Sequence, residues 1–319
     1  MAQTAFVFPG QGSQRVGMGL DILGRRPDFA DTYYGIADEV MGFPLSELCW
    51  HGPAERLQDT AVTQPAVFLT SLMVLDVLRA HDVDADVVAG HSLGEYTALV
   101  AAGVLDWTDA LRLVAVRGRL MSTVNRRTPG AMAAVLGLAP ATVEAVCAAV
   151  SAASGEVVEV ANFNEPGQTV VSGRANAVRK ATQDALEAGA RRVVPLRVGA
   201  PFHCSLMRDI EAEFAESLAS VAFREPVIPV ISSVTAAPVS SAEEIVAVLR
   251  RQLTAPVRWT GAVTAMAERG ADRFVEVGPG RVLTGLCRRI APELAAHTAG
   301  TVDDIARTVD AVSAGVPAN

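Results

Sequence analysis

The first 128 residues combine short apolar runs that end in glycine with longer apolar stretches at helical spacing. The short runs predict buried strands at Thr4–Phe8, before Pro9-Gly10, and at Asp86–Gly90. The longer stretches predict helices, which fall within 15–60, over Ala66–Leu78 after Gln64-Pro65, from Ser92 to about Gly103, and over about 107–121. Strands followed by helices are typical of an α/β fold.

The pattern changes between Pro129-Gly130 and Gly199-Ala200-Pro201. Strands are expected over 131–137, 156–162, 168–173 and 191–198, and helices over 139–153 and 176–189. The order β-α-β-β-α-β is that of a ferredoxin-like unit. We therefore predict a small ferredoxin-like domain, residues 129–199, inserted into a large domain made of residues 1–128 and 200–319.

The C-terminal part returns to the mixed pattern of the first. The expected helices are 205–220, one near 242–253, one near 258–269 and one after Gly280; the expected strands are 227–232 and 273–277. The tail after Asp310 is small and polar, and we expect it to fray.

Composition narrows the possible functions. Half of the residues are hydrophobic and 19% are charged, which excludes a disordered chain. The net charge is −8 and no basic block is present, so a nucleic-acid partner is not expected. No uninterrupted apolar run reaches the ~18 residues of a membrane span. The N-terminus has no basic segment of the kind that precedes a secretory signal, so we expect a cytoplasmic protein without membrane contact.

The cysteines give no sign of a metal or disulfide framework. Cys49, Cys147, Cys204 and Cys287 lie far apart, and the chain has neither a CxxC nor an HExxH motif. We expect free, buried thiols and no metal site.

The clearest local motif is Gly90-His91-Ser92-Leu93-Gly94, which matches G-x-S-x-G directly after a predicted strand and at the start of a predicted helix. This context is that of a nucleophile elbow, in which a sharp turn exposes the serine hydroxyl. The N–H groups and the positive end of the new helix then face negative charge that develops on a substrate. The alternative is a structural glycine turn with a serine that caps the helix.

A serine nucleophile needs a base. His91 lies inside the turn and should point away from the hydroxyl, and His51 and His81 lie in polar, loop-like contexts. His297 would fit the serine-acid-histidine order of α/β-hydrolases, whereas His203 lies where the chain re-enters the large domain. Spacing alone does not choose between these last two.

Two of these segments resemble malonyl-CoA:acyl carrier protein transacylases: Phe8–Gln14 (FPGQGSQ) and Gly90–Tyr96 (GHSLGEY). Other segments match in the same order, from about residue 4 to residue 291: TQPA at 63–66, the surroundings of Arg117, NFNEPGQ at 162–168, PFHCSLM at 201–207, RQL at 251–253 and EVGPG at 276–280. Colinear matches over nearly the whole chain are more specific than any one motif.

The resemblance implies an α/β-hydrolase-like large domain with an inserted ferredoxin-like domain, and it implies roles for particular residues. Without it, Arg117 would be grouped with Arg112 and Arg119 as surface arginines of one helix. The implied catalytic roles are Ser92 as nucleophile, His203 as general base, a carbonyl of Gln252 as the group that orients the histidine, the backbone N–H groups of Gln11 and Leu93 as oxyanion hole, and Arg117 as the ligand of a malonyl carboxylate.

Three further residues are weaker candidates for the acyl site. Gln64 and Asn162 could hydrogen-bond near the acyl group or simply order loops, and Phe202 could shape the pocket or simply pack in the core. Candidate basic residues for an acidic carrier are Lys180, Arg191-Arg192 and Arg288-Arg289.

The expected function is transfer of a malonyl group from malonyl-CoA, through an acyl-serine, to the phosphopantetheine thiol of an acyl carrier protein in fatty acid synthesis. The expected protein is a monomer that needs no bound cofactor or metal, because the CoA thioester and phosphopantetheine are substrates. Two alternatives stay open: a stand-alone acyltransferase that supplies malonyl or substituted malonyl units to a polyketide synthase carrier, and a serine esterase or thioesterase.

Overall fold

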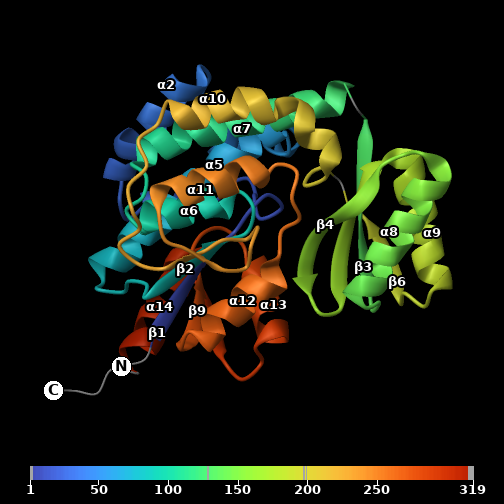
Figure 1. The fold of residues 1–319 in the computed structure, drawn as a ribbon. Coiled ribbons are helices and arrows are strands. Elements are labelled where there is room, and N and C mark those ends of the chain that lie inside the picture. Colours follow the sequence, from blue (N-terminus) through green and yellow to red (C-terminus); the bar gives the residue numbers. More distant parts are fainter. Residues whose placement is uncertain (1–2, 128, 197, 199, 315–319) are drawn as a thin grey trace.

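The structure is a computed structural model that describes residues 3–127, 129–196, 198 and 200–314. It contains two sheets that lie side by side, each with its own helices (Figure 1). The strands are β1 (Gln3–Phe8), β2 (Val87–Gly90), β3 (Gly130–Leu136), β4 (Val158–Glu165), β5 (Gln168–Arg174), β6 (Arg192–Pro195), β7 (Val230–Ile231), β8 (Pro238–Val239), β9 (Ala271–Glu276) and β10 (Ala295–Thr298).

The helices include one π-helical segment, η1, and one 3₁₀ segment, η2. They are α1 (Leu20–Leu23), η1 (Ala30–Gly35), α2 (Ile36–Met41), α3 (Leu45–His51), α4 (Ala54–Leu57), α5 (Thr60–Ala80), α6 (Gly94–Ala101), α7 (Trp107–Arg127), α8 (Pro140–Ser154), α9 (Ala175–Glu187), η2 (Ser205–Ile210), α10 (Glu211–Ala219), α11 (Ala242–Arg251), α12 (Trp259–Glu268), α13 (Val282–Ile290) and α14 (Val302–Ser313).

The larger sheet has the order β10-β9-β1-β2-β7-β8, and every pairing in it is parallel except that of β7 with β8. Its central strand β1 is buried on both faces. Phe6 and Phe8 pack into the core that contains α5, α6 and α7, while Ala5 and Val7 pack against α12 and α13. A parallel sheet covered on both faces has its polar edge at the carboxyl ends of its strands, where the chain leaves β1 and β2.

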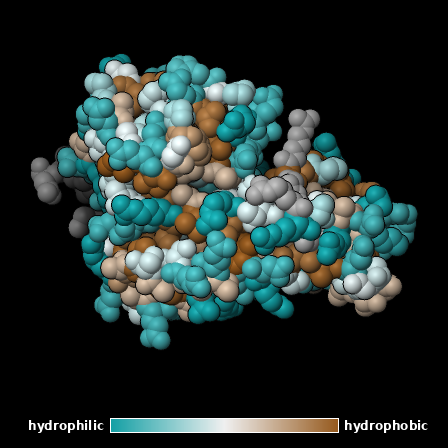
Figure 2. Space-filling model, turned by 90° about the horizontal axis from the view of Figure 1, so that it is seen from above, coloured by the Kyte–Doolittle hydropathy of each residue, from teal (hydrophilic) through white to brown (hydrophobic). Residues whose placement is uncertain are grey.

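The smaller sheet has the order β4-β5-β3-β6 and is antiparallel throughout, and α8 and α9 cover one face of it. With its two helices it follows the β-α-β-β-α-β order, so the predicted fold class, a large α/β unit with a ferredoxin-like insert, is confirmed. Seen from above, the insert forms a separate lobe beside the larger unit (Figure 2).

Backbone hydrogen bonds join the smaller sheet to a loop of the larger unit. The Phe163 N–H of β4 donates to the Val257 carbonyl at 2.8 Å, and the Val257 N–H donates to the Ala161 carbonyl at 2.8 Å. The loop before α12 thus adds a short parallel bridge to the edge strand of the smaller sheet. A side-chain link lies nearby, since the Glu159 carboxylate accepts from the Ser205 N–H at 2.7 Å.

Several predicted boundaries were wrong. The helix expected to begin after Gln64-Pro65 begins at Thr60, because the Asp59 side chain caps it by accepting from the Ala61 N–H, and Pro65 lies within the helix. The helix expected over 205–220 is divided between η2 and α10, and the strand expected over 227–232 shortens to β7. Of the strand expected over 191–198, β6 covers 192–195, and residue 197 lies outside the described part.

After α13 the chain forms two elements that the sequence pattern did not indicate. Ala295–Thr298 forms β10 because the edge of β9 offers it a full set of parallel backbone partners. Thr301 then caps α14 by accepting from the Asp304 N–H, and this helix continues to Ser313 instead of fraying after Asp310. Residues 315–319 lie outside the described part.

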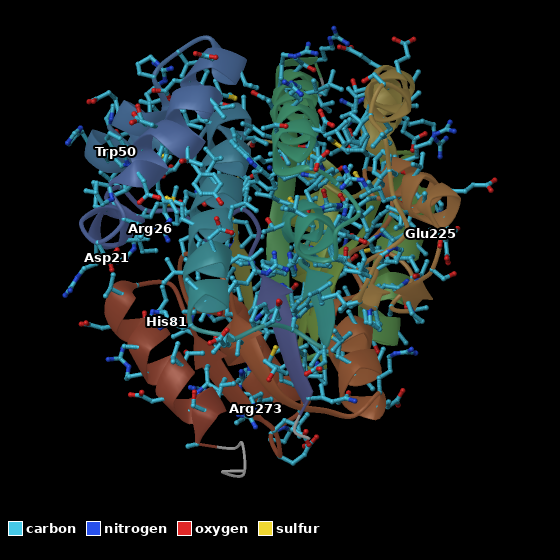
Figure 3. All side chains as sticks on the ribbon, turned by 90° about the vertical axis from the view of Figure 1, so that its left-hand side faces the viewer. Asp21, Arg26, Trp50, His81, Glu225 and Arg273 are labelled. Carbon is cyan, nitrogen blue, oxygen red and sulfur yellow. The ribbon has the colours of Figure 1, made fainter. Side chains whose placement is uncertain are left out.

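Helix α5 is the one described helix that is long and apolar enough to cross a membrane by length and composition, and 83% of its apolar window is buried inside the fold. It packs against α7 and α6 and supplies the centre of the larger core. At its C-terminal end His81 is exposed on the surface (Figure 3), which excludes this histidine from the site described next.

Candidate active site

Ser92 lies at a tight turn between β2 and α6. Its φ of 52° is in the left-handed region, which costs a non-glycine residue about 1 kcal/mol or more. The turn requires glycine on both sides: a Cβ on Gly90 would lie 1.9 Å from the Gly94 carbonyl carbon, and one on Gly94 would lie 2.0 Å from the Phe8 oxygen. The G-x-S-x-G motif is therefore a nucleophile elbow, which presents the Ser92 hydroxyl at the carboxyl edge of the sheet.

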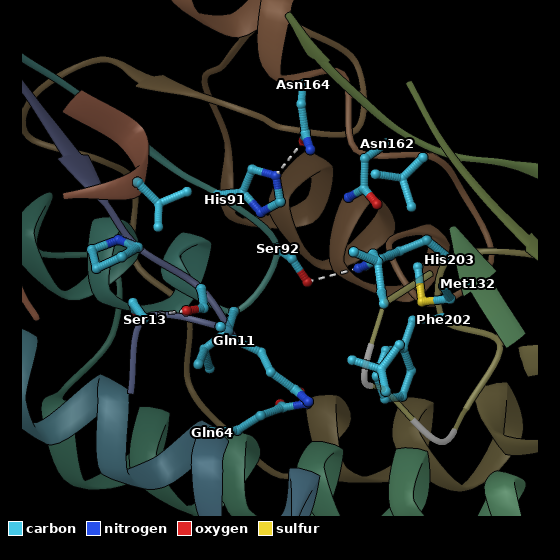
Figure 4. Close-up of a pocket in the computed structure, with 18 of the residues that line it drawn as sticks. Gln11, Ser13, Gln64, His91, Ser92, Met132, Asn162, Asn164, Phe202 and His203 are labelled. Atoms are coloured by element: carbon cyan, nitrogen blue, oxygen red, sulfur yellow. Dashed lines mark hydrogen bonds between the residues drawn. The ribbon is translucent and has the colours of Figure 1, made fainter. Parts of the chain in front are cut away.

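His203 is the histidine that faces this hydroxyl. Its Nε2 lies 2.8 Å from Ser92 Oγ (Figure 4). Its Nδ1 lies 2.9 Å from the backbone carbonyl of Gln252. Because a carbonyl only accepts, Nδ1 carries the proton and Nε2 is free to accept the proton of Ser92. A carbonyl thus occupies the place that a carboxylate has in a serine-histidine-aspartate triad.

Of the two histidines that spacing left as candidates, the structure places His203 beside Ser92 and His297 away from it. His297 lies in β10, where it pairs with Val275 in the sheet, and it is not among the residues that line the cavity around Ser92. His51 is exposed and contacts Glu47. His91 points away from the hydroxyl beside it, as predicted, and its Nε2 contacts Asn164 Oδ1 at 3.0 Å.

Burial sets the protonation state of His203. The side chain is 4% exposed, and desolvation, reinforced by the Arg117 charge, lowers its pKa to about 3. The imidazole is consequently neutral, and able to act as a base, far below the ordinary histidine pKa of about 6.5.

This shift gives a pH prediction for the free enzyme. Because protonation of His203 would occur only near pH 3, kcat/KM for acylation by a CoA thioester should show no fall centred near pH 6.5. We expect it to change by less than about threefold between pH 8 and pH 5 in stopped-flow acylation measurements. A tenfold loss centred near pH 6.5 would contradict this assignment of the base.

Two backbone amides lie at the base of the elbow. Leu93 immediately precedes α6, so its N–H belongs to the positive end of that helix. The loop after β1 brings Gln11 alongside, because Gly10 has no side chain: a Cβ there would lie 2.6 Å from the His91 carbonyl oxygen. Among the described residues neither amide has a hydrogen-bond acceptor, and both residues line the cavity. They are placed to serve as an oxyanion hole.

Arg117 is a buried cation, 1% exposed, and extends from α7 towards Ser92. Its Nη2 donates to Ser92 Oγ at 3.0 Å and its Nη1 to Gln64 Oε1 at 2.7 Å. Its neighbour Gly118 lets α7 approach α5 closely, since a Cβ there would lie 2.9 Å from the Thr60 carbonyl oxygen. No carboxylate pairs with this guanidinium within the described part of the chain. Arg117 is therefore a buried positive charge without an anionic partner, directly beside the nucleophile.

The cavity around Ser92 has a volume of about 530 Å³ and lies between the two units of the fold. The predicted residues Gln64, Asn162 and Phe202 all line it, and each is at least nine-tenths buried. The ferredoxin-like unit contributes an apolar wall, which consists of Met132, Val170, Leu196 and Val198. Gln252 does not line the cavity but is fully buried behind it. It contacts the cavity residues Arg117, His203 and Ser92.

Three features of the site were missed at the sequence level. Asn164 anchors His91 from β4, and Met121 accepts a hydrogen bond from Gln64 Nε2 at 3.2 Å. Glu95 is a buried acid behind the elbow, and Gln252 Nε2 donates to it at 2.6 Å. Glu95 and Asn164 belong to the motifs GHSLGEY and NFNEPGQ, so their presence in those segments was the one available signal.

The four cysteines are buried and free, and Cys204, next to the base, is held with Sγ 3.2 Å from the Pro201 carbonyl. Burial raises its thiol pKa to about 11, so the thiol is protonated at neutral pH and is not a competing nucleophile. Within the described part of the chain no cluster of three or more His, Cys, Asp or Glu side chains could hold a metal ion.

Comparison with known protein sequences identifies one family over nearly the whole chain. Residues 5–309 match the family described as acyl transferase domain. The malonyl CoA-acyl carrier protein transacylase of Escherichia coli K12 is 44% identical over 297 residues, which are 93% of this chain and 95% of that protein.

Solved structures agree with this assignment. The malonyl-CoA:acyl carrier protein transacylase of Xanthomonas oryzae pv. oryzae superposes with a TM-score of 0.93 at 42% identity, over 98% of each chain. A malonyl-transacylase solved in complex with its type II polyketide synthase acyl-carrier protein gives a TM-score of 0.93 at 39% identity, over 97% of this chain and all of that one. The protein therefore belongs to the malonyl-CoA:acyl carrier protein transacylases, within the acyl transferase domain family.

Proposed function

We propose that the protein transfers a malonyl group from malonyl-CoA, through an ester on Ser92, to the phosphopantetheine thiol of an acyl carrier protein in fatty acid synthesis. The observation that carries this proposal is Arg117, a buried guanidinium that pairs with no carboxylate among the described residues and whose Nη2 lies 3.0 Å from Ser92 Oγ. An acyl group on Oγ that ends in a carboxylate would place that carboxylate beside the guanidinium, where two parallel hydrogen bonds can form.

In the first half-reaction His203 Nε2 takes the proton of Ser92 as Oγ attacks the thioester carbonyl carbon. The negative charge that develops on the carbonyl oxygen faces the amides of Gln11 and Leu93. When the carbon–sulfur bond breaks, the CoA thiolate receives the proton from His203 and leaves, and malonyl-Ser92 remains. The charge on Arg117 is then matched by the malonyl carboxylate.

In the second half-reaction the thiol of the carrier arm gives its proton to His203 and its sulfur attacks the ester. The carbon–oxygen bond breaks, and Ser92 Oγ recovers the proton. The exchange between thioester and ester needs no bound cofactor or metal, and it predicts ping-pong kinetics.

We further propose a cytoplasmic monomer with a small domain over residues 129–199 and a large domain over 1–128 and 200–319. Four free thiols are consistent with a reducing compartment, and the four-stranded sheet together with α8 and α9 occupies residues 130–195.

Intact-protein mass spectrometry tests the reaction. The protein is mixed in turn with malonyl-, methylmalonyl- and acetyl-CoA, and an acyl carrier protein bearing phosphopantetheine is then added. We expect a malonyl adduct that forms in preference to an acetyl adduct and disappears when the carrier is added. Release of free CoA without an adduct would instead support a hydrolase, and a dominant methylmalonyl adduct would support polyketide supply.

Replacement of Arg117 by alanine should change the acyl preference. Loss of a buried charge pair with the substrate should lower kcat/KM for malonyl-CoA by about 100-fold or more. The value for acetyl-CoA should stay the same or rise, because acetyl has no carboxylate to bind. Arg117→Lys keeps the positive charge but cannot form two parallel hydrogen bonds. Its kcat/KM for malonyl-CoA should lie between those of the wild-type protein and Arg117→Ala. Arg112→Ala, an exposed position on the same helix, is the control. Equal losses for both donors would contradict the assigned role.

The carrier should approach the mouth of the cavity, where exposed basic residues can meet an acidic partner. Arg15 and Arg281 are exposed, adjoin the cavity-lining Gln14 and Val282, and have no ion-pair partner within the described residues. Of the residues proposed from the sequence, Lys180 pairs with Asp184 and Arg289 with Glu165. Arg288 donates to the Ala296 carbonyl, and Arg191-Arg192 is exposed.

Charge reversal at Arg281 tests this approach. Arg281→Glu is expected to raise KM for the carrier several-fold while KM for malonyl-CoA stays unchanged, and the effect should shrink at high salt. Steady-state transfer assays with the two substrates varied separately measure both values. Equal changes in the two KM values would contradict a carrier-docking role.

A polyketide carrier remains the second candidate, because one of the solved relatives was captured with its type II polyketide synthase acyl-carrier protein. Both carriers present the same arm, so the chemistry at Ser92 is the same. Transfer rates to a fatty acid carrier and to a polyketide carrier, compared at equal concentration, decide between them.

A further inference from the structure

Glu95 is a buried acid to which the mechanism above gives no role. It lies three residues after Ser92, on the first turn of α6, and its side chain is 2% exposed. One carboxylate oxygen, Oε2, accepts from Ser233 Oγ at 2.7 Å and from Gln252 Nε2 at 2.6 Å. A buried acid with neutral donors on both sides is costly unless its contacts serve the structure or the reaction.

Glu95 makes the shortest of the contacts that orient the Gln252 amide. Gln252 Nε2 has two acceptors, the Glu95 carboxylate and the Ser92 carbonyl at 3.1 Å. On the opposite side, Gln252 Oε1 accepts from Arg117 Nη2 at 3.0 Å. The reversed amide would set oxygen against two acceptors and nitrogen against a cationic donor, so only the observed orientation is compatible with these neighbours.

The same arrangement leaves the positive charge of Arg117 available to bind a substrate carboxylate. The acceptors around its Nη atoms, Gln64 Oε1, Ser92 Oγ and Gln252 Oε1, are all uncharged. A carboxylate in direct contact would pair with the guanidinium and compete with the carboxylate of a substrate. The Gln252 amide lies between the acid and Arg117, so Glu95 fixes the group that holds Arg117 without itself contacting it.

We propose that Glu95 is a positioning residue for acyl selectivity: by fixing the Gln252 amide, it holds Arg117 Nη2 beside Ser92 Oγ in the geometry that receives the carboxylate of the acyl group. This inference rests on the proposed function, since it names what sets the preference of the same site. The quantity that tests it is the selectivity, defined as the ratio of kcat/KM for acylation by malonyl-CoA to kcat/KM for acylation by acetyl-CoA.

The competing explanation is that Glu95 merely ties α6 to Ser233. Loss of such a tie would loosen the elbow and slow acylation by both donors in the same proportion. A positioning role predicts a different result, because only the malonyl reaction depends on Arg117.

The experiment compares two substitutions of nearly equal volume. Glu95→Met removes the acceptor, and the selectivity should fall about tenfold or more, as expected for loss of a hydrogen bond to a charged group. Glu95→Gln can place its amide oxygen where Oε2 lies, accept from the same two donors, and keep the selectivity within about threefold. Glu276→Met is the matched control, because Glu276 is equally buried but holds the N-terminus of α13 through Leu283 and Thr284; its selectivity should stay unchanged.

A double variant shows whether the effect passes through Arg117. Once Arg117→Ala has removed the guanidinium, adding Glu95→Met should change the selectivity no further. If Glu95→Met does not fold, Gln252→Met tests the same link from its other end, since the backbone carbonyl to His203 remains, and a selectivity loss of similar size is expected.

The outcomes distinguish a failure of the proposed function from a failure of the role proposed for Glu95. A wild-type protein that forms no malonyl adduct would overturn the proposed function and this inference with it. A wild-type protein that prefers malonyl, with Glu95→Met or Gln252→Met at unchanged selectivity, would overturn the inference alone. A selectivity loss in Glu95→Met that persists undiminished in the Arg117→Ala background would also overturn it.

Discussion

Replacement of Ser92 by alanine is expected to remove the malonyl adduct and to reduce transfer to the carrier by a factor on the order of 10⁴ or more. The reason is that the covalent intermediate forms on Ser92 Oγ, while the neighbouring groups that bind the acyl group stay in place. Arg117 keeps its contacts with Gln64 and Gln252 when the hydroxyl is removed. Malonyl-CoA should therefore still bind, with Kd within a few-fold of that of the wild-type protein.

Intact mass and isothermal titration calorimetry together test this expectation. Ser122→Ala is the control, because Ser122 lies on the same helix as Arg117 and contacts Asp59 instead of the elbow; it should keep the full adduct. A malonyl adduct of normal yield on the Ser92→Ala protein would show that another residue carries the acyl group.

Replacement of His203 by asparagine should slow acylation by a factor of about 10² to 10⁴, the usual contribution of a general base. Asparagine suits the position because His203 has φ 58°, and asparagine tolerates this left-handed conformation better than most residues. The loss should thus arise from the missing proton acceptor and not from a displaced loop. Single-turnover measurements with malonyl-CoA give the rate directly.

His297→Asn is the matched comparison, since His297 was the other candidate base. It lies in β10 with its carbonyl accepting from Thr284, and acylation should proceed at the wild-type rate. Equal losses in the two variants would mean that neither change reports on proton transfer.

The elbow could be predicted from the sequence because everything that forms it is local. A β-prone run, two glycines four residues apart and a following helix leave one geometry for the residue between them, and the Gly90 and Gly94 contacts show why. The ferredoxin-like insert was predictable for a similar reason: its six elements follow one another along the chain and pair with near neighbours.

The partners of the nucleophile could not be obtained in this way. His203 is 111 residues from Ser92, and Gln252 is 160 residues from it, so only the folded chain shows which distant groups meet. Spacing alone left His203 and His297 as equally good candidates for the base. Before the structure was considered, only the resemblance to a known family favoured His203.

Burial is the second quantity that the pattern left undetermined. Arg112, Arg117 and Arg119 follow one another on α7, yet only Arg117 is enclosed, because Gly118 brings that part of the helix against α5. The role proposed for Glu95 depends on the same kind of information, since an acidic side chain is normally exposed.

The division of the cavity between two units has a consequence for how such proteins diversify. The proposed nucleophile and base, Ser92 and His203, come from the large α/β unit, whereas Met132, Val170, Leu196 and Val198 of the insert form an apolar wall. Substitutions in that wall can enlarge or reshape the space for the acyl chain while the elbow and its base keep their geometry. Changes in the insert can then alter the size of the acyl group that fits, whereas the proposed preference for a carboxylate stays with Arg117 of the large unit.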